Sequence, residues 1–278
     1  MPSSGRTDGT ALPDKVEQEH IWRIVLKNGQ MFRGHIIEQS DNQIRIDLFG
    51  AGEMTLELDQ VQSITVDKTV EINEKGEIYK RDPNRTRYLY SPSAMPLGKG
   101  EKYFSQKMLF FSSYAQGVTD NISFLVGSMI PAIFWGGYNF ITAVKVADTF
   151  SEDGLHLATG FEAFHLTDGN DGGTAGFIFG SATIGTHLKH WTISVGKPFI
   201  SDPESSDLGP VIATLSGNLR IGRKTSLISE NWFVDGEVIN SFAVRLMGEN
   251  LAVDLGGIVP MGEPDMMIPW LDFTYNTF

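Results

Sequence analysis

The stretch PVIATLSGNLRIG, residues 210–222, decides the fold of this chain. Apolar side chains occupy one of its faces: Val211, Ala213, Leu215, Leu219 and Ile221. Polar side chains occupy the other: Thr214, Ser216, Asn218 and Arg220. Alternation with a period of two is typical of a β-strand that has one apolar and one polar face. The stretch is longer than an ordinary strand of roughly 5–6 residues and is long enough to cross a bilayer obliquely, which takes about 9–11.

Similar strands recur along the chain at a regular spacing. SFAVRLM (241–247), LAVDLGG (251–257) and the final PWLDFTYNTF (269–278) alternate in the same way. Short polar turns recur about every 32 residues, by count: Asp120-Asn121, 152–154, Gly185-Thr186, Arg223-Lys224 and Glu249-Asn250. Connections of variable length lie between them, at 136–137, 169–173, 201–210, 235–236 and 261–265. This spacing predicts eleven strands from Glu101 to the end, and TRYLYSPS (86–93) adds a twelfth.

An even number of long amphipathic strands indicates a closed barrel, because closure leaves no unpaired sheet edge in a lipid environment. We therefore predict an all-β fold in which residues 86–278 form a closed antiparallel transmembrane β-barrel of about 12 strands. The last strand would close the ring by pairing with the first. The alternative is a soluble all-β protein, in which Leu215, Leu219 and Ile221 would lie in a buried core.

Six charged side chains fall within the predicted strands, in phase with small or polar neighbours: Lys145, Glu162, Arg220, Arg245, Asp254 and Asp272. On the lipid face, an Arg or Lys at the bilayer midplane costs about 2–4 kcal/mol. We therefore expect all six to face the lumen, with Arg245 and Asp254 close enough to pair across the 248–251 turn. Their mixed signs favour a filled interior or a narrow pore over an open channel.

Aromatic residues suggest where the membrane interfaces lie. Those expected in interfacial girdles are Trp135, Tyr138, Phe140, Trp191, Trp232, Trp270 and Tyr275. Girdles of this kind flank the apolar band of membrane barrels. The uncharged stretch Ile122–Val144 is long enough for a membrane helix, but its glycines, proline and β-branched residues favour a hairpin with its tip at Gly136-Gly137.

The N-terminal part has a different composition, with four aromatic residues in positions 1–80 against 26 in the remaining 198. Residues 1–19 are polar and are predicted to be a disordered lead-in. Residues 20–66 predict a small SH3-like or Sm-like domain of five short strands. Its predicted core is Ile24, Ile36, Ile44, Ile46 and Leu56. Asn28-Gly29 predicts a type I′ turn, and residues 67–85 predict a linker.

Several functional classes are excluded. The net charge of −12 argues against nucleic-acid binding, which needs a basic face. The chain has no cysteine, and His187 and His190 would point to opposite faces of one strand. A calcium-loop reading of Asp168, Asn170 and Asp171 fails because Phe179 stands where the motif needs Glu. We expect no catalytic residue, no metal and no cofactor, and therefore no enzyme.

Two resemblances add to this reading. The end of the chain, with Phe273, Tyr275 and Phe278, resembles the C-terminal signal that the outer-membrane assembly machinery recognises. Residues 86–127 resemble an uncharacterised family of small bacterial outer-membrane barrel proteins that also carry an N-terminal small-barrel segment. The shared features are Tyr88 and Tyr90, the Pro92–Pro96 stretch, Leu97–Glu101 and the Gly117–Asn121 turn. The resemblance implies a location in the outer membrane but no activity.

These observations leave two function classes open besides the soluble protein. One is a non-enzymatic outer-membrane barrel, either a narrow pore or a structural barrel with a periplasmic β-domain. The other is a membrane-anchored interaction module or accessory subunit, in which residues 20–66 bind a periplasmic protein. Both imply outer-membrane lipid and the assembly machinery as partners. The first twenty residues contain no apolar leader segment, and we expect that a signal peptide has been removed.

Overall fold

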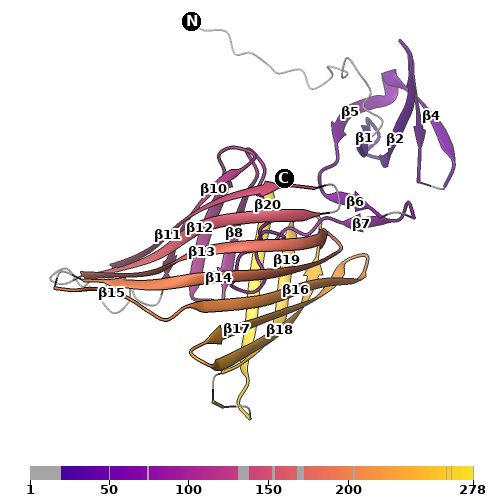
Figure 1. Cartoon of the computed structure of the whole chain (residues 1–278). Coiled ribbons are helices and arrows are strands. Elements are labelled where there is room, and N and C mark those ends of the chain that lie inside the picture. The colour runs from indigo at the N-terminus through magenta and orange to yellow at the C-terminus, as the bar shows by residue number, and fades with distance from the viewer. Residues whose placement is uncertain are drawn as a thin grey trace, which may run out of the picture. The chain divides into compact units, whose positions relative to one another are not determined.

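The computed structural model describes residues 20–49, 51–73, 75–130, 138–151, 154–167, 172–202, 204–260, 262–263 and 265–277. The chain divides into two compact units, residues 1–81 and 82–278 (Figure 1). The lead-in predicted for residues 1–19 lies outside the described residues.

The N-terminal unit contains a five-stranded antiparallel sheet. Its strands are β1 (Trp22–Leu26), β2 (Met31–Gln39), β3 (Gln43–Asp47), β4 (Glu53–Glu57) and β5 (Val61–Val66), in the order β4-β3-β2-β1-β5. The predicted core is confirmed, since Ile24, Ile36, Ile44 and Ile46 are at most 1% exposed and Leu56 is 7% exposed. The alternating apolar residues of these strands therefore share one face of the sheet, and this face forms the core of the unit.

Two predictions for this unit are wrong. The first hairpin has a four-residue loop, in which Gly29 N donates to Leu26 O at 2.9 Å. Gly29 has a φ of 85°, but Asn28 is not at positive φ, so the turn is not type I′. The segment expected as a linker contains a second hairpin, in which β6 (Val70–Ile72) pairs antiparallel with β7 (Ile78–Lys80). Backbone pairing thus orders residues whose charge suggested a flexible connection.

The second unit is a closed antiparallel ring of twelve strands, as predicted. They are β8 (Lys102–Lys107), β9 (Phe111–Gly117), β10 (Ile122–Met129), β11 (Tyr138–Thr149), β12 (Leu155–Thr167), β13 (Gly172–Thr186), β14 (Lys189–Ser201), β16 (Ile212–Gly222), β17 (Thr225–Val234), β18 (Glu237–Met247), β19 (Leu251–Val259) and β20 (Ile268–Thr277). The ring closes where β20 pairs with β8. The short β15 (Ser206–Leu208) pairs with the end of β14. The last strand of the chain therefore removes both edges of the sheet (Figure 1).

The identity of one strand was predicted wrongly. Residues 86–93 are not part of the ring, and their one β-bridge joins Arg87 to Pro92 within the segment itself. The twelfth strand arises instead from residues 101–119, which fold into β8 and β9 around a turn at Met108-Leu109. The hairpin of β10 and β11 agrees with the prediction for Ile122–Val144. Its tip at Gly136-Gly137 lies outside the described residues. Over the part of the chain that the structure describes, no helix is long and apolar enough to cross a membrane.

The outer face of the ring is apolar. Leu215, Leu219 and Ile221 are 43%, 43% and 57% exposed. Phe242, Val244 and Leu246 follow the same pattern on β18, with exposures of 52%, 38% and 46%. A soluble β-sandwich would bury these residues in its core. The apolar faces of the strands therefore point away from the interior of the barrel.

Candidate functional site: a polar interior filled by residues 82–97

Residues 82–97 lie inside the ring, and we call them the interior segment. Tyr88, Leu89, Ser91, Ala94 and Met95 are each at most 1% exposed. The segment is hydrogen-bonded to side chains of β8, β11, β12, β13, β14, β16, β17, β18 and β20. A short segment can reach strands on all sides of a closed ring only from within it. The lumen is therefore occupied by the chain itself.

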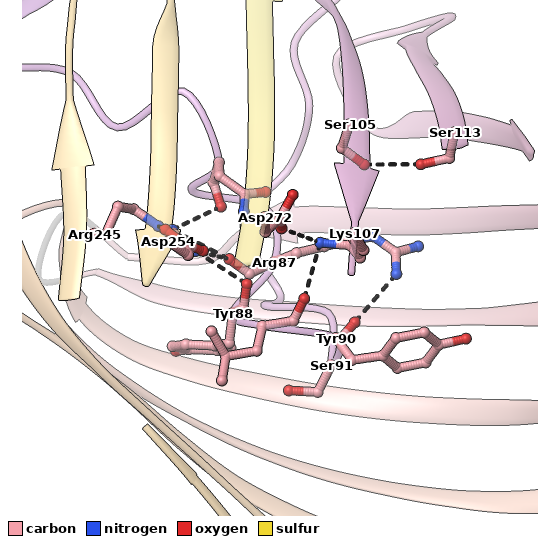
Figure 2. A network of polar contacts seen from close by, with 12 residues as sticks. Arg87, Tyr88, Tyr90, Ser91, Ser105, Lys107, Ser113, Arg245, Asp254 and Asp272 are labelled. Carbon is pink, nitrogen blue, oxygen red and sulfur yellow. Dashed lines mark hydrogen bonds and ion pairs between the residues drawn. The ribbon is translucent and has the colours of Figure 1, made fainter. Parts of the chain in front are cut away.

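Arg245 is the centre of one polar cluster (Figure 2). Its guanidinium donates one hydrogen bond to each carboxylate oxygen of Asp254, at 2.7 and 2.8 Å, and a third to the carboxylate of Asp82 at 2.8 Å. It also donates to the carbonyl oxygens of Asn84 and Tyr88, at 3.1 and 3.0 Å. The expected pair of Arg245 and Asp254 is thus present, and the two residues are directly opposite in the β18–β19 register. A planar guanidinium suits this bidentate arrangement.

Glu230 on β17 holds the middle of the interior segment. One carboxylate oxygen accepts hydrogen bonds from the backbone N–H groups of Leu89, Tyr90 and Ser91, at 3.0, 3.0 and 2.9 Å. The Ser91 hydroxyl donates to the same oxygen at 2.8 Å. The other oxygen accepts from the indole Nε1 of Trp232 at 2.7 Å. Glu230 is 2% exposed, so its charge is stabilised by these donors instead of by water.

Two lysines bind backbone carbonyls of the interior segment. Lys107 on β8 donates to Leu89 O at 2.8 Å and forms an ion pair with Asp272 at 2.5 Å. Lys145 on β11 donates to Ser93 O and Met95 O, at 3.1 and 2.9 Å. Each ammonium group thereby satisfies carbonyl groups that have no strand partner. Buried backbone acceptors need such partners when no sheet supplies them.

Glu162 on β12 binds the segment from another side. It accepts a hydrogen bond from Arg87 at 2.9 Å and another from the hydroxyl of Tyr90. Near the start of β8, the guanidinium of Arg85 pairs with Glu101. Around the ring, carboxylates and cations are therefore mixed instead of forming a lining of one sign. Such buried pairs repay their desolvation only with good geometry, so their number alone does not indicate a stable barrel.

Five of the six charged residues that we expected to face the lumen have polar partners in the interior. Lys145, Glu162, Arg245, Asp254 and Asp272 belong to the network described above, and Arg245, Asp254 and Asp272 are each 1% exposed. Arg220 is partly buried and interacts electrostatically with Asp82. Glu101, Lys107 and Glu230 also belong to this network, although the sequence did not predict them as interior charges. The sequence could have predicted Glu230 as an interior residue, because it lies on the same face of its strand as Ser226 and Trp232.

The aromatic girdle prediction is wrong for two tryptophans. Trp270 is 7% exposed and is in phase with Asp272, and Trp232 binds Glu230. Both side chains therefore lie in the interior. Tyr138, Phe140, Trp191 and Tyr275 are on the outer face, with exposures of 71%, 52%, 55% and 53%. Trp135 lies outside the described residues.

The histidines bind hydroxyl and carbonyl groups of neighbouring residues. His190 contacts Thr186 O at 3.1 Å, and His156 contacts the Thr149 hydroxyl at 2.9 Å. His165 stacks on Phe140 with ring centroids 4.3 Å apart. Within the described ranges, no group of three or more His, Cys, Asp or Glu side chains could hold a metal ion. The possible calcium loop at 168–171 lies outside those ranges.

The residues that resemble an assembly signal lie on β20. Phe273 and Tyr275 are on its outer face, 37% and 53% exposed, while Phe278 lies outside the described residues. Inside the barrel, two small cavities of about 30 and 20 Å³ flank the interior segment. At about 10–15 Å³ for each water, they have room for about two and one water molecules.

Comparisons with known proteins gave little similarity. No protein-family model matches the chain, and no curated protein matches it. Among solved structures, the chain is similar to a KdgM porin in complex with disordered oligogalacturonate. The TM-score is 0.42 and the identity 8%, over 64% of this chain and 99% of the porin chain.

Proposed function

We propose that this chain is a non-enzymatic outer-membrane β-barrel whose lumen is kept closed by its own interior segment. The observation that carries the proposal is the apolar outer face of the closed ring. Large exposed apolar residues occur on every strand of the ring except β9. A soluble monomer rarely exposes a contiguous apolar patch of more than a few hundred Å². Contact with the hydrocarbon core of a bilayer would cover such a surface.

The filled interior favours a structural anchor over a pore. The interior segment occupies the lumen through contacts with nine of the twelve strands. Mixed charges neutralise one another there, so the lining selects neither cations nor anions. On this proposal, the barrel anchors the N-terminal unit to the membrane. The tight-turn end would face the periplasm, where the N-terminal unit, folded as a small SH3-like domain, would bind a protein partner.

The first test is conductance and thermal resistance of the purified full-length protein. In a planar bilayer we expect no steady single-channel current, because the interior segment blocks the lumen. In SDS we expect a compact, fast-migrating form at room temperature that converts to the unfolded form on boiling, because the strand ring is closed. Stable ohmic channels would contradict the closed lumen, and a detergent-free soluble monomer would contradict the membrane location.

A gated narrow pore is the second candidate. The interior segment is bound by side chains and takes no part in the strand ladder of the ring. Its withdrawal would leave the ring intact while opening the lumen. Weakening its contacts should then produce currents that the unmodified protein lacks, which distinguishes a gated pore from a permanent anchor.

A further inference from the structure

A cavity of about 30 Å³ lies between the interior segment and one side of the barrel wall. Arg87 of the interior segment lines it, and so do Tyr103 on β8, Ser123 on β10 and Lys145 on β11. Tyr103 and Ser123 are the second residues of their strands, and Ser123 is directly opposite Lys145 in the β10–β11 register. The cavity is therefore close to the tight-turn end of the barrel, where these strands begin.

The hydrogen bonds of Lys145 show that its side chain is charged. Nζ lies 2.9, 3.1 and 3.4 Å from the carbonyl oxygens of Met95, Ser93 and Thr86. A carbonyl oxygen only accepts hydrogen bonds, so three of them need three donors, and only the ammonium form of lysine has three N–H groups. The carbonyl groups stabilise this ammonium, but they are neutral and do not cancel its charge.

The carboxylates near the cavity already have cationic partners. Glu101 is paired with Arg85, and Glu162 is paired with Arg87. Lys145 interacts electrostatically with Arg85, Arg87 and Glu101, and it forms no ion pair within the described part of the chain. Three cations thus share two carboxylates, which leaves one positive charge in excess at this place in the interior. A buried charge without a counter-charge is costly.

The cavity is also lined by donors that lack an acceptor. Tyr103 and Ser123 are 4% and 8% exposed, and their hydroxyl groups have no hydrogen-bond partner among the described residues. Arg87 has five N–H groups, of which one donates to Tyr90 O at 3.2 Å and one to Glu162 at 2.9 Å. No Asp or Glu is among the described residues that line the cavity. Buried donors in such a place need an acceptor from outside the chain.

We propose that this cavity is a binding site for one small monovalent anion, such as chloride. The anion accepts hydrogen bonds from Arg87, Tyr103 and Ser123, and its charge balances that of Lys145. Chloride is only slightly larger than a water molecule, so a cavity with room for about two waters holds it. Two waters would satisfy the hydroxyl groups but would leave the excess positive charge uncompensated. Phosphate and sulfate are too large for the cavity.

The bound anion connects the interior segment to the wall. Arg87 belongs to the interior segment, whereas Tyr103 and Ser123 belong to strands of the ring. Lys145, whose charge the anion balances, holds two further carbonyl groups of the segment, those of Ser93 and Met95. The anion therefore stabilises the closed state of the lumen. The site lies in the interior and does not depend on what covers the outer face, so this inference and the proposed membrane location can fail separately.

The first test is urea unfolding of the purified full-length protein in detergent, with chloride replaced by gluconate at constant ionic strength. Urea is suitable because it is uncharged and brings no chloride. Once chloride exceeds its dissociation constant, each tenfold increase should stabilise the protein by about 1.4 kcal/mol. Lys145→Met should abolish this dependence, because it removes the excess charge and keeps a side chain of similar length. Lys102→Met, at an exposed position on β8, is the matched control and should keep it.

Tyr103→Phe is the second variant, and it decides the matter if Lys145→Met does not fold. It keeps every charge and removes one donor to the anion. We expect the chloride concentration for half-maximal stabilisation to rise about tenfold or more, as for a lost hydrogen bond to a charged group. An unchanged chloride dependence in Tyr103→Phe would overturn the site, and so would one that persists in Lys145→Met.

Bromide gives a direct readout of the position. In crystals of the unmodified protein that contain bromide, anomalous scattering should show a peak within hydrogen-bond distance of the Tyr103 and Ser123 hydroxyl groups. The peak should weaken in crystals of Tyr103→Phe. A cavity without bromide, or a stability of the unmodified protein that does not respond to chloride, would mean that water fills the cavity and would overturn the proposal.

Discussion

At the scale of single residues, Glu230 and Arg245 each connect the wall to several residues of the interior segment. Glu230 accepts three backbone N–H groups and one hydroxyl through a single oxygen. No strand of the ring offers partners to these N–H groups. Arg245 has the complementary role, because it donates to carbonyl groups of the same segment. The two side chains replace the backbone pairing that the segment lacks.

Changing Glu230 to Ala should destabilise the barrel by about 3 kcal/mol or more, because several buried donors lose a charged acceptor together. Glu230→Gln should cost less, since it keeps one neutral acceptor. The measurement is reversible denaturant unfolding in vesicles. Glu237→Ala, at an exposed position on β18, is the control and should change stability by no more than about 0.5 kcal/mol. A Glu230→Ala protein as stable as this control would mean that the segment is held by other contacts.

The same variant separates the two candidate functions. If the interior segment is a gate, Glu230→Ala should show intermittent currents in a planar bilayer, while Glu237→Ala stays silent. If the barrel is a permanent anchor, both variants stay silent.

At the scale of elements, each strand has one face toward lipid and one toward the interior. On β16, Leu219 is 43% exposed and Asn218 is 3% exposed. A shift of one residue in register would exchange these faces. The charges of the network would then enter lipid, at about 2–4 kcal/mol for each Arg or Lys.

Single cysteines test this orientation directly, because the chain has none of its own. In vesicles, Leu219→Cys should react with a lipid-phase thiol reagent, whereas Arg220→Cys should not. Asn218→Cys is a second interior position, in case loss of Arg220 disturbs the fold. Lipid-phase labelling at 220 with protection at 219 would reverse the assignment of every interior residue.

At the scale of the whole molecule, the chain combines two units with different requirements. The barrel needs a bilayer to cover its outer face. The N-terminal unit has its own core of eight buried apolar residues and needs no lipid. Its strand β5 leads into Asp67, whose side chain binds Arg33 and the hydroxyl and N–H of Thr69. Burial alone would raise the pKa of Asp67, but hydrogen bonds from Thr69 and Arg33 outweigh it and hold the pKa below its usual value.

The fragment 20–81 should therefore unfold cooperatively in water without the barrel. Because the folded pKa of Asp67 is lowered, its stabilising contribution is complete above about pH 4 and is lost as the pH falls below that value. Asp67→Asn should be less stable than the unmodified fragment at pH 7 by about 1–3 kcal/mol, and the difference should shrink in acid. Urea melts at pH 7 and pH 3 measure both. A non-cooperative melt would show that the unit needs the barrel to fold.

The sequence by itself determined the class of fold, because alternation and turn spacing are local properties. Leu219 and Arg220 could be assigned to opposite faces from their neighbours alone. The core of the N-terminal sheet, including Ile24 and Ile44, follows from the same short-range pattern. Pairing of Arg245 with Asp254 was predictable for a similar reason, since a single turn joins their strands.

Tertiary structure alone decided what fills the barrel. Residues 86–93 alternate well enough to suggest a strand, but their backbone groups are satisfied by side chains up to 158 positions away, such as those of Arg245 and Glu230. Trp270 lies inside because β20 keeps the phase of Asp272, although its type suggested an interface. Local pattern cannot reveal such long-range partners. A buried backbone needs partners for its N–H and C=O groups. For residues 82–97, side chains on the inner face of the closed ring are those partners.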